Sequence, residues 1–124
     1  MIRVVVKHES NTLSNGSSER ENIIGFFCEG HSGYGKGGPD IVCAAVSVIM
    51  DTIERGIRDL PMCRPTEITI KIDSIRNSVS YDCENSISLG PLYSLFEAAR
   101  LSFMSIAAEY PDDVSFEDTY VSQT

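Results

Sequence analysis

Positive charge is scarce in this chain of 124 residues, which has 10 Lys and Arg against 18 Asp and Glu and a net charge of −8. The scarcity argues against binding to nucleic acid, whose phosphates are neutralised by Lys and Arg. A basic partner or substrate would suit an acidic chain, because opposite charges steer encounter. Solubility alone would account for the same balance, so the charge excludes one class of partner without selecting another.

Long apolar runs are also missing. No run approaches the roughly 20 residues that span a bilayer. The first residues, Met1 to Lys7, have neither the apolar core nor the small-residue cleavage site of a signal peptide. We therefore expect a cytoplasmic protein without membrane contact. The length and the apolar share of 42% predict one globular domain over residues 1–124.

The chain has few cysteines, and they form neither a C-x-x-C pair nor a zinc-finger spacing. In a reducing cytoplasm we expect reduced thiols, most of them ordinary core residues. A metal site made of His31 and Cys43, with His8 or Cys28, is the alternative, because zinc accepts these ligands. It lacks a closely spaced ligand pair, so we expect no metal and no cofactor.

The hydrophobic periodicity predicts a mixed fold. A period of two, typical of half-buried strands, marks four segments: 2–7, 23–29, 68–73 and 79–83. Helical spacing begins at Asp40, which we expect to be the N-cap, and ends near Gly56; it returns between Pro91 and Pro111.

The order of these segments is ββαββα, with the option of a short strand at 114–116. We expect a two-layer α+β domain in which two main helices cover a sheet of four to five strands. The polar segment 10–21 contains Asn15-Gly16 and is predicted to be a mobile hairpin connection. Residues 118–124 are predicted to be a flexible tail.

The stretch GHSGYGKGGPDIVCAAVS, from Gly30 to Ser47, places a histidine twelve residues before a cysteine. Cys43 would lie in the first turn of the helix, where unpaired N–H groups and the helix dipole favour a thiolate. His31 would then be its base, and Ser47 follows one turn later on the same face. The same two residues could equally be structural, with Asp40 only a helix cap.

The same stretch, with GH followed by G-x-D-I-V-C-A-A-V-S, resembles the signature of the ribosomal-processing cysteine protease family, Prp. The segments GFFCEGH, EITIKI and YPDDVSF fall in the order of that family. The resemblance covers most of the chain and is most specific within the signature. Two features depart from it, a longer segment at 10–21 and a loop richer in glycine before Pro39.

The resemblance implies a His31–Cys43 dyad on a small homodimeric α+β fold, with Asp40 and Ser47 as supporting residues. It implies removal of the short N-terminal extension of a basic large-subunit ribosomal protein, the twenty-seventh of its series. Family substrates place aromatic residues before the cut and a small residue after it. The loop glycines are expected to form a lid over the substrate: Gly33, Gly35, Gly37 and Gly38. A non-catalytic or retargeted interaction module on the same fold is the alternative.

Overall fold

The computed structural model describes residues 1–12, 18–30, 40–59, 68–73, 78–83 and 92–122. These residues form five strands and two long helices, and their order confirms the ββαββα prediction with a further strand at the end. The elements are β1 (Ile2–Thr12), β2 (Ser18–Glu29), α1 (Asp40–Asp59), β3 (Ile68–Asp73), β4 (Ser78–Cys83), α2 (Leu92–Glu109) and β5 (Val114–Ser122).

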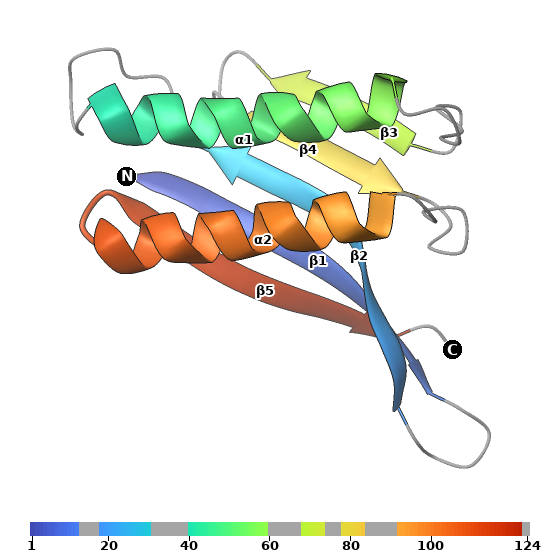
Figure 1. Ribbon diagram of the computed structural model, residues 1–124. Coiled ribbons are helices and arrows are strands. Elements are labelled where there is room, and N and C mark those ends of the chain that lie inside the picture. The colour runs from blue at the N-terminus through green and yellow to red at the C-terminus, as the bar shows by residue number, and fades with distance from the viewer. Residues whose placement is uncertain (13–17, 31–39, 60–67, 74–77, 84–91, 123–124) are drawn as a thin grey trace.

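The strands form one sheet in the order β3-β4-β2-β1-β5. All neighbours are antiparallel except β1 and β5, which are parallel. Both helices lie on the same face of this sheet, α1 beside the β2–β4 half and α2 beside β1 and β5 (Figure 1). The expected two-layer α+β domain is therefore confirmed. Neither helix is long and apolar enough to cross a membrane.

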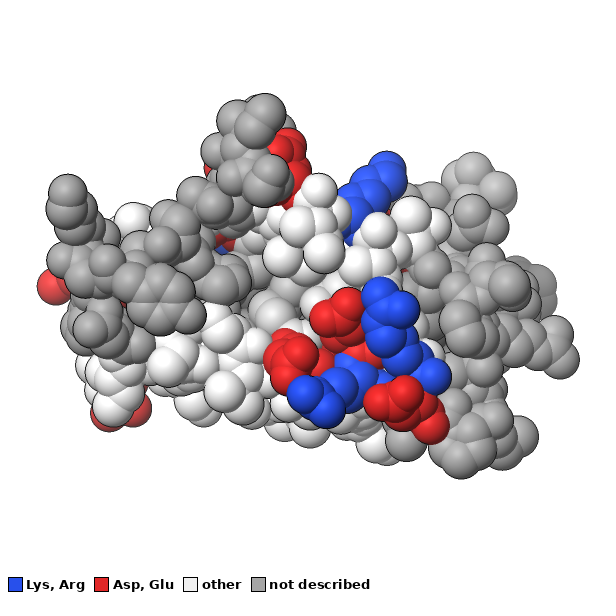
Figure 2. Space-filling model, turned by 90° about the horizontal axis from the view of Figure 1, so that it is seen from above, with Lys and Arg blue, Asp and Glu red and all other residues white. Residues whose placement is uncertain are grey.

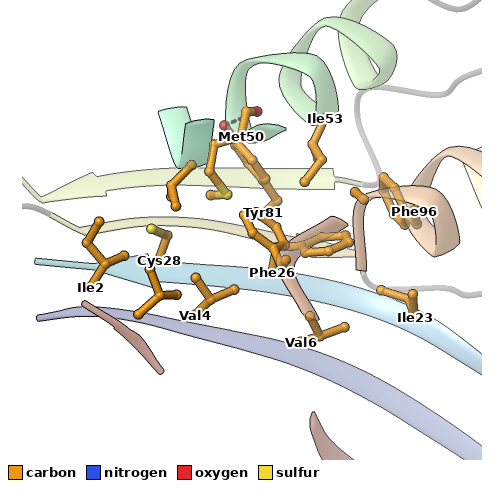
Figure 3. Close-up of a cluster of buried hydrophobic side chains, with 14 of the residues drawn as sticks. Ile2, Val4, Val6, Ile23, Phe26, Cys28, Met50, Ile53, Tyr81 and Phe96 are labelled. Carbon is orange, nitrogen blue, oxygen red and sulfur yellow. Dashed lines mark hydrogen bonds between the residues drawn. The ribbon is translucent and has the colours of Figure 1, made fainter. Parts of the chain in front are cut away.

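The core lies between the helices and the sheet because each element has one apolar face. Ile2, Val4 and Val6 of β1 point toward the helices, and so do Phe26 and Cys28 of β2 (Figure 3). Helix α1 contributes an apolar stripe with the spacing of successive helical turns: Val42, Val46, Met50, Ile53 and Ile57. The stripe fixes the rotation of α1 about its own axis, and hence the direction of its other side chains.

Two local features of the fold differ from the sequence prediction. In β2 the pairing with β1 passes from Lys7–Gly25 directly to His8–Ile23, so Ile24 is the extra residue of a β-bulge. The bulge turns Ile23 into the core. A strand that alternated strictly from Cys28 and Phe26 would have placed Ile24 there instead. Gly56 does not end α1 either; it is buried, and the helix continues to Asp59.

The strands β1, β2 and β5 are also longer than predicted. Pairing between β1 and β2 extends to Thr12 and Ser18, so most of segment 10–21 is strand, and both strands continue beyond the helices (Figure 1). Strand β5 pairs with β1 as far as Ser122, well into the segment predicted as a tail. The polar composition of these two segments gave no sign of a strand, because strand pairing depends on backbone hydrogen bonds.

A polar network anchors β5 to α2. Arg100 of α2 donates two hydrogen bonds to the Asp118 carboxylate, at 2.9 and 2.7 Å. The Nε2 atom of buried His8 lies 2.7 Å from the same carboxylate, and the His8 ring stacks on Tyr120. The Arg100 hydrogen bonds, assisted by the one from His8, hold the pKa of Asp118 below its ordinary value.

We predict that Asp118→Asn lowers the free energy of unfolding by about 1–3 kcal/mol near neutral pH, because charged hydrogen bonds are lost. A lowered carboxyl pKa adds stability above the unfolded-state pKa, and this stability is lost as the pH falls through the folded-state value. The difference between parent and variant should therefore shrink from about pH 6 to about pH 3. Urea unfolding at both pH values measures it.

The matched control for this prediction is Glu117→Gln, the neighbouring carboxylate, which lies 3.9 Å from Arg3 with both side chains 57% exposed. We expect almost no change in stability from it, since exposed ion pairs contribute little. An Asp118→Asn difference of the same size at both pH values would contradict the assigned role of the carboxylate.

Candidate active site

Cys43 lies in the first turn of α1, which begins at Asp40 as the sequence predicted. The neighbouring Val42 is fully buried in the core, and Cys43 is half-buried beside it and packs against the same cluster. The thiol is thus held at the edge of the helix–sheet interface and keeps contact with solvent. At this end of α1 the helix dipole favours negative charge.

Cys28 is the second thiol at this end of the sheet, and its surroundings are opposite in character. It lies in β2, fully buried under α1, whereas Cys43 is partly exposed; both are reduced. Burial, with a smaller contribution from the charge of Cys43, raises the pKa of Cys28 to about 12. Cys28 is therefore a protonated core residue near neutral pH, as expected for most of the cysteines.

Gly30 turns the chain as it leaves β2, one residue before His31 in the sequence. Its φ of 86° is left-handed, and a side chain built on it would approach the Met1 carbonyl oxygen to 2.5 Å. Only glycine fits both the backbone angle and the space. This requirement was not predicted from the sequence, although Gly30 is the first residue of the signature stretch.

His31 and the loop glycines lie outside the described residues. The proposed pairing of His31 with Cys43 and the predicted lid therefore stay predictions. The backbone of Asp40 begins α1, and Ser47 lies on the next turn after Cys43, half-buried on the same side of the helix.

An open cavity of about 410 Å³ lies along this side of α1, lined by Ser47, Val48, Met50, Asp51, Glu54 and Tyr81. Tyr81 comes from β4 and donates a hydrogen bond from its hydroxyl to the Met50 carbonyl oxygen at 3.1 Å (Figure 3). The acidic residues and Tyr81 are not among the site residues predicted from the sequence. The sequence does indicate one part of this arrangement. Ser47, Asp51 and Glu54 follow Cys43 at spacings of four, eight and eleven residues, which place them on the same side of a helix.

The alternative metal site gains no support from the described part of the chain, where no group of three His, Cys, Asp or Glu side chains could hold an ion. His8 instead hydrogen-bonds to Asp118. Cys28 pairs with Val4 of β1, and His8 lies four residues further along that strand, which is about 13 Å. His8 and Cys28 are therefore too far apart to bind one metal ion together.

The fold and the half-buried cysteine at the start of its first helix define an α+β domain with a thiol site. The family model named cysteine protease Prp matches residues 1–115. The chain belongs to this family of cysteine proteases, which confirms the resemblance found in the signature.

Solved structures share the fold of this chain. The structure of the essential ribosomal processing protease Prp from S. aureus with a substrate peptide has a TM-score of 0.72 at 18% identity, covering 96% of this chain and all of that one. The same protein with a covalently linked product peptide has a TM-score of 0.65 at 18% identity, covering 92% and 99%. SMU.848 from Streptococcus mutans has a TM-score of 0.75 at 23% identity, covering 98% and 99%. No match was found among curated proteins.

We predict that iodoacetamide alkylates Cys43 at least about 100-fold faster than Cys28 near neutral pH. The reason is that the thiolate is the reactive form, and Cys28 is both buried and shifted to a high pKa. Peptide mapping after timed quenching gives the rate at each cysteine. Cys43→Ala should remove the fast site; equal native rates at Cys28 and Cys43 would show that the two environments are wrongly assigned.

Proposed function

We propose that this chain is an endopeptidase with a His31–Cys43 dyad, and that it removes the N-terminal extension of the twenty-seventh large-subunit ribosomal protein. The observation that carries the proposal is the position of Cys43, half-buried in the first turn of α1 within a chain of the Prp family. The similar S. aureus protein, called a ribosomal processing protease, supports the ribosomal substrate.

The reaction would follow the general chemistry of cysteine peptidases. His31 takes the proton of Cys43, and the thiolate attacks the carbonyl carbon of the scissile peptide bond. The N–H groups at the start of α1 are the candidate donors to the oxyanion. When the C–N bond breaks, His31 returns the proton to the leaving amine; water then hydrolyses the thioester and restores the thiol. Asp40 and Ser47 would support the dyad from the same helix.

The expected substrate suits the charge of the chain. The expected precursor is a basic ribosomal protein, and the chain has a net charge of −8, so opposite charges would steer the two together. The site of action would be the cytoplasm, where ribosomal precursors are made.

The proposal includes a homodimer. An apolar hollow between α1 and α2 supports it, because large apolar side chains of both helices line it, among them Val48, Ile49 and Ile106, and because Ile41 and Val48 on its rim are 67% and 64% exposed. Soluble monomers seldom expose such residues together. Sedimentation equilibrium of the parent protein should then give twice the mass of the chain.

We predict that the parent protein shortens the ribosomal precursor of its own cell, whereas Cys43→Ala leaves it intact. His31→Ala should slow cleavage by about 100-fold or more, because it removes both the base and the acid for the leaving amine. Alkylation of Cys43 should fall less in His31→Ala, since alkylation needs no leaving-group proton. Intact mass of the precursor over time measures cleavage.

The control for cleavage is Cys28→Ala, which removes a thiol that the structure buries away from solvent. It should process the precursor at a rate near that of the parent. Cleavage by Cys43→Ala at the parent rate would contradict the nucleophile. A folded parent that binds the precursor without cutting it would favour the alternative, a non-catalytic or retargeted module.

A further inference from the structure

The cavity beside α1 begins one turn beyond Cys43. Ser47 lies four residues after the cysteine, Asp51 eight and Glu54 eleven, and all three line the cavity. At 1.5 Å per residue, the two carboxylates are about 12 and 16 Å from Cys43 along the helix axis. An extended peptide advances about 3.3 Å per residue. A peptide bound along α1 with its scissile bond at Cys43 would reach the carboxylates within about three to five residues.

The cavity has an apolar wall and an acidic rim. Met50 and Tyr81, both buried, form part of its wall, and Asp51 and Glu54 are the charged residues in the part of its lining that the structure describes. The pKa of Tyr81 is raised, first by burial and then by the negative charges of Glu54 and Asp51. The negative charges of both carboxylates therefore act at the Tyr81 hydroxyl, against a smaller opposing effect of Arg58.

Both carboxylates already have partners on α1, and these pairs are weak. Asp51 pairs with Arg55, with side chains 56% and 73% exposed, and Glu54 pairs with Arg58, with side chains 29% and 60% exposed. Exposed pairs of this kind contribute about 0–1 kcal/mol, so a cation from a ligand can compete with them. Figure 2 shows charged side chains of both signs gathered over the second half of α1, whereas residues 41–49 of the first half have no charged side chain.

We propose that this cavity is a specificity subsite that binds a Lys or Arg side chain of the peptide, three to five residues from the scissile bond. The aliphatic part of such a side chain would pack on Met50 and Tyr81, while its charged end meets Asp51 and Glu54. A volume of about 410 Å³ is ample for one long side chain. The inference rests on the proposed function, because it takes Cys43 as the point of cleavage.

The test uses peptides from the N-terminal extension of the cell's own ribosomal precursor. In each peptide one residue, about three to five positions from the cut on either side, is Lys, Gln or Glu. We expect parent kcat/KM to favour Lys over Glu at one of these positions by about fivefold or more, and the preference to weaken at high salt. The double variant Asp51→Asn with Glu54→Gln should lose most of the preference.

The matched control is Asp59→Asn, which removes an exposed carboxylate of the same helix that does not line the cavity. It should keep the parent preference for Lys. Arg55→Gln with Arg58→Gln removes the competing cations and should strengthen that preference. Thermal melting checks that every variant is folded; we expect small shifts, since these side chains lie at the surface.

A second measurement separates this inference from the proposed function. Fluorescence anisotropy of the same labelled peptides on Cys43→Ala reports binding without cleavage. Tighter binding of Lys than Glu peptides, lost in the cavity double variant, supports the subsite even when the parent cuts none of them. No discrimination in either assay, or the same discrimination after both carboxylates are neutralised, overturns it.

Discussion

Burial of the α1 stripe against β2 and β4 is the constraint on which the site depends. Val42 and Val46 are fully buried, so the first two turns of α1 have one permitted rotation above the sheet. Cys43 follows Val42 and is therefore held at the border of the core, where a thiol is both supported and accessible. A rotation of α1 by one residue, about 100°, would bury the thiol or swing it away from the sheet.

The same packing separates the two thiols by function. Cys28 fills the core under α1 and its pKa is raised to about 12, which removes it from chemistry near neutral pH. Cys43 lies next to the N–H groups at the helix start. Further along the helix, the buried turn at Met50 receives the Tyr81 hydroxyl and forms the wall of the cavity. One helix thus carries the candidate nucleophile at its start and the candidate subsite in its second half.

Much of this arrangement follows from local patterns in the sequence. Periodicity predicted the element order, the start of α1 at Asp40 and the position of Cys43 in its first turn, because helix–sheet packing repeats with the period of each element. The family signature lies in the same segment, and the family match confirmed it.

The features that could not be predicted depend on contacts between distant segments. The bulge at Ile24 depends on the register of β1 against β2, and the length of β5 depends on pairing with β1 and on the anchor from Arg100. Tyr81 joins the cavity from β4, thirty-one residues after Met50. No local pattern in α1 indicates which strand residue will lie beside it. The pairing of His31 with Cys43 rests on the signature, since His31 lies outside the described residues.

The central claim is that Cys43 becomes covalently attached to the peptide during cleavage. Rapid mixing of the protein with the ribosomal extension peptide, acid quenching and peptide mapping by mass spectrometry test it directly. The account predicts a transient adduct on Cys43 with the mass of the N-terminal product less one water, formed before free product and absent from Cys43→Ala. An adduct on another cysteine, or full turnover by Cys43→Ala, would contradict the account.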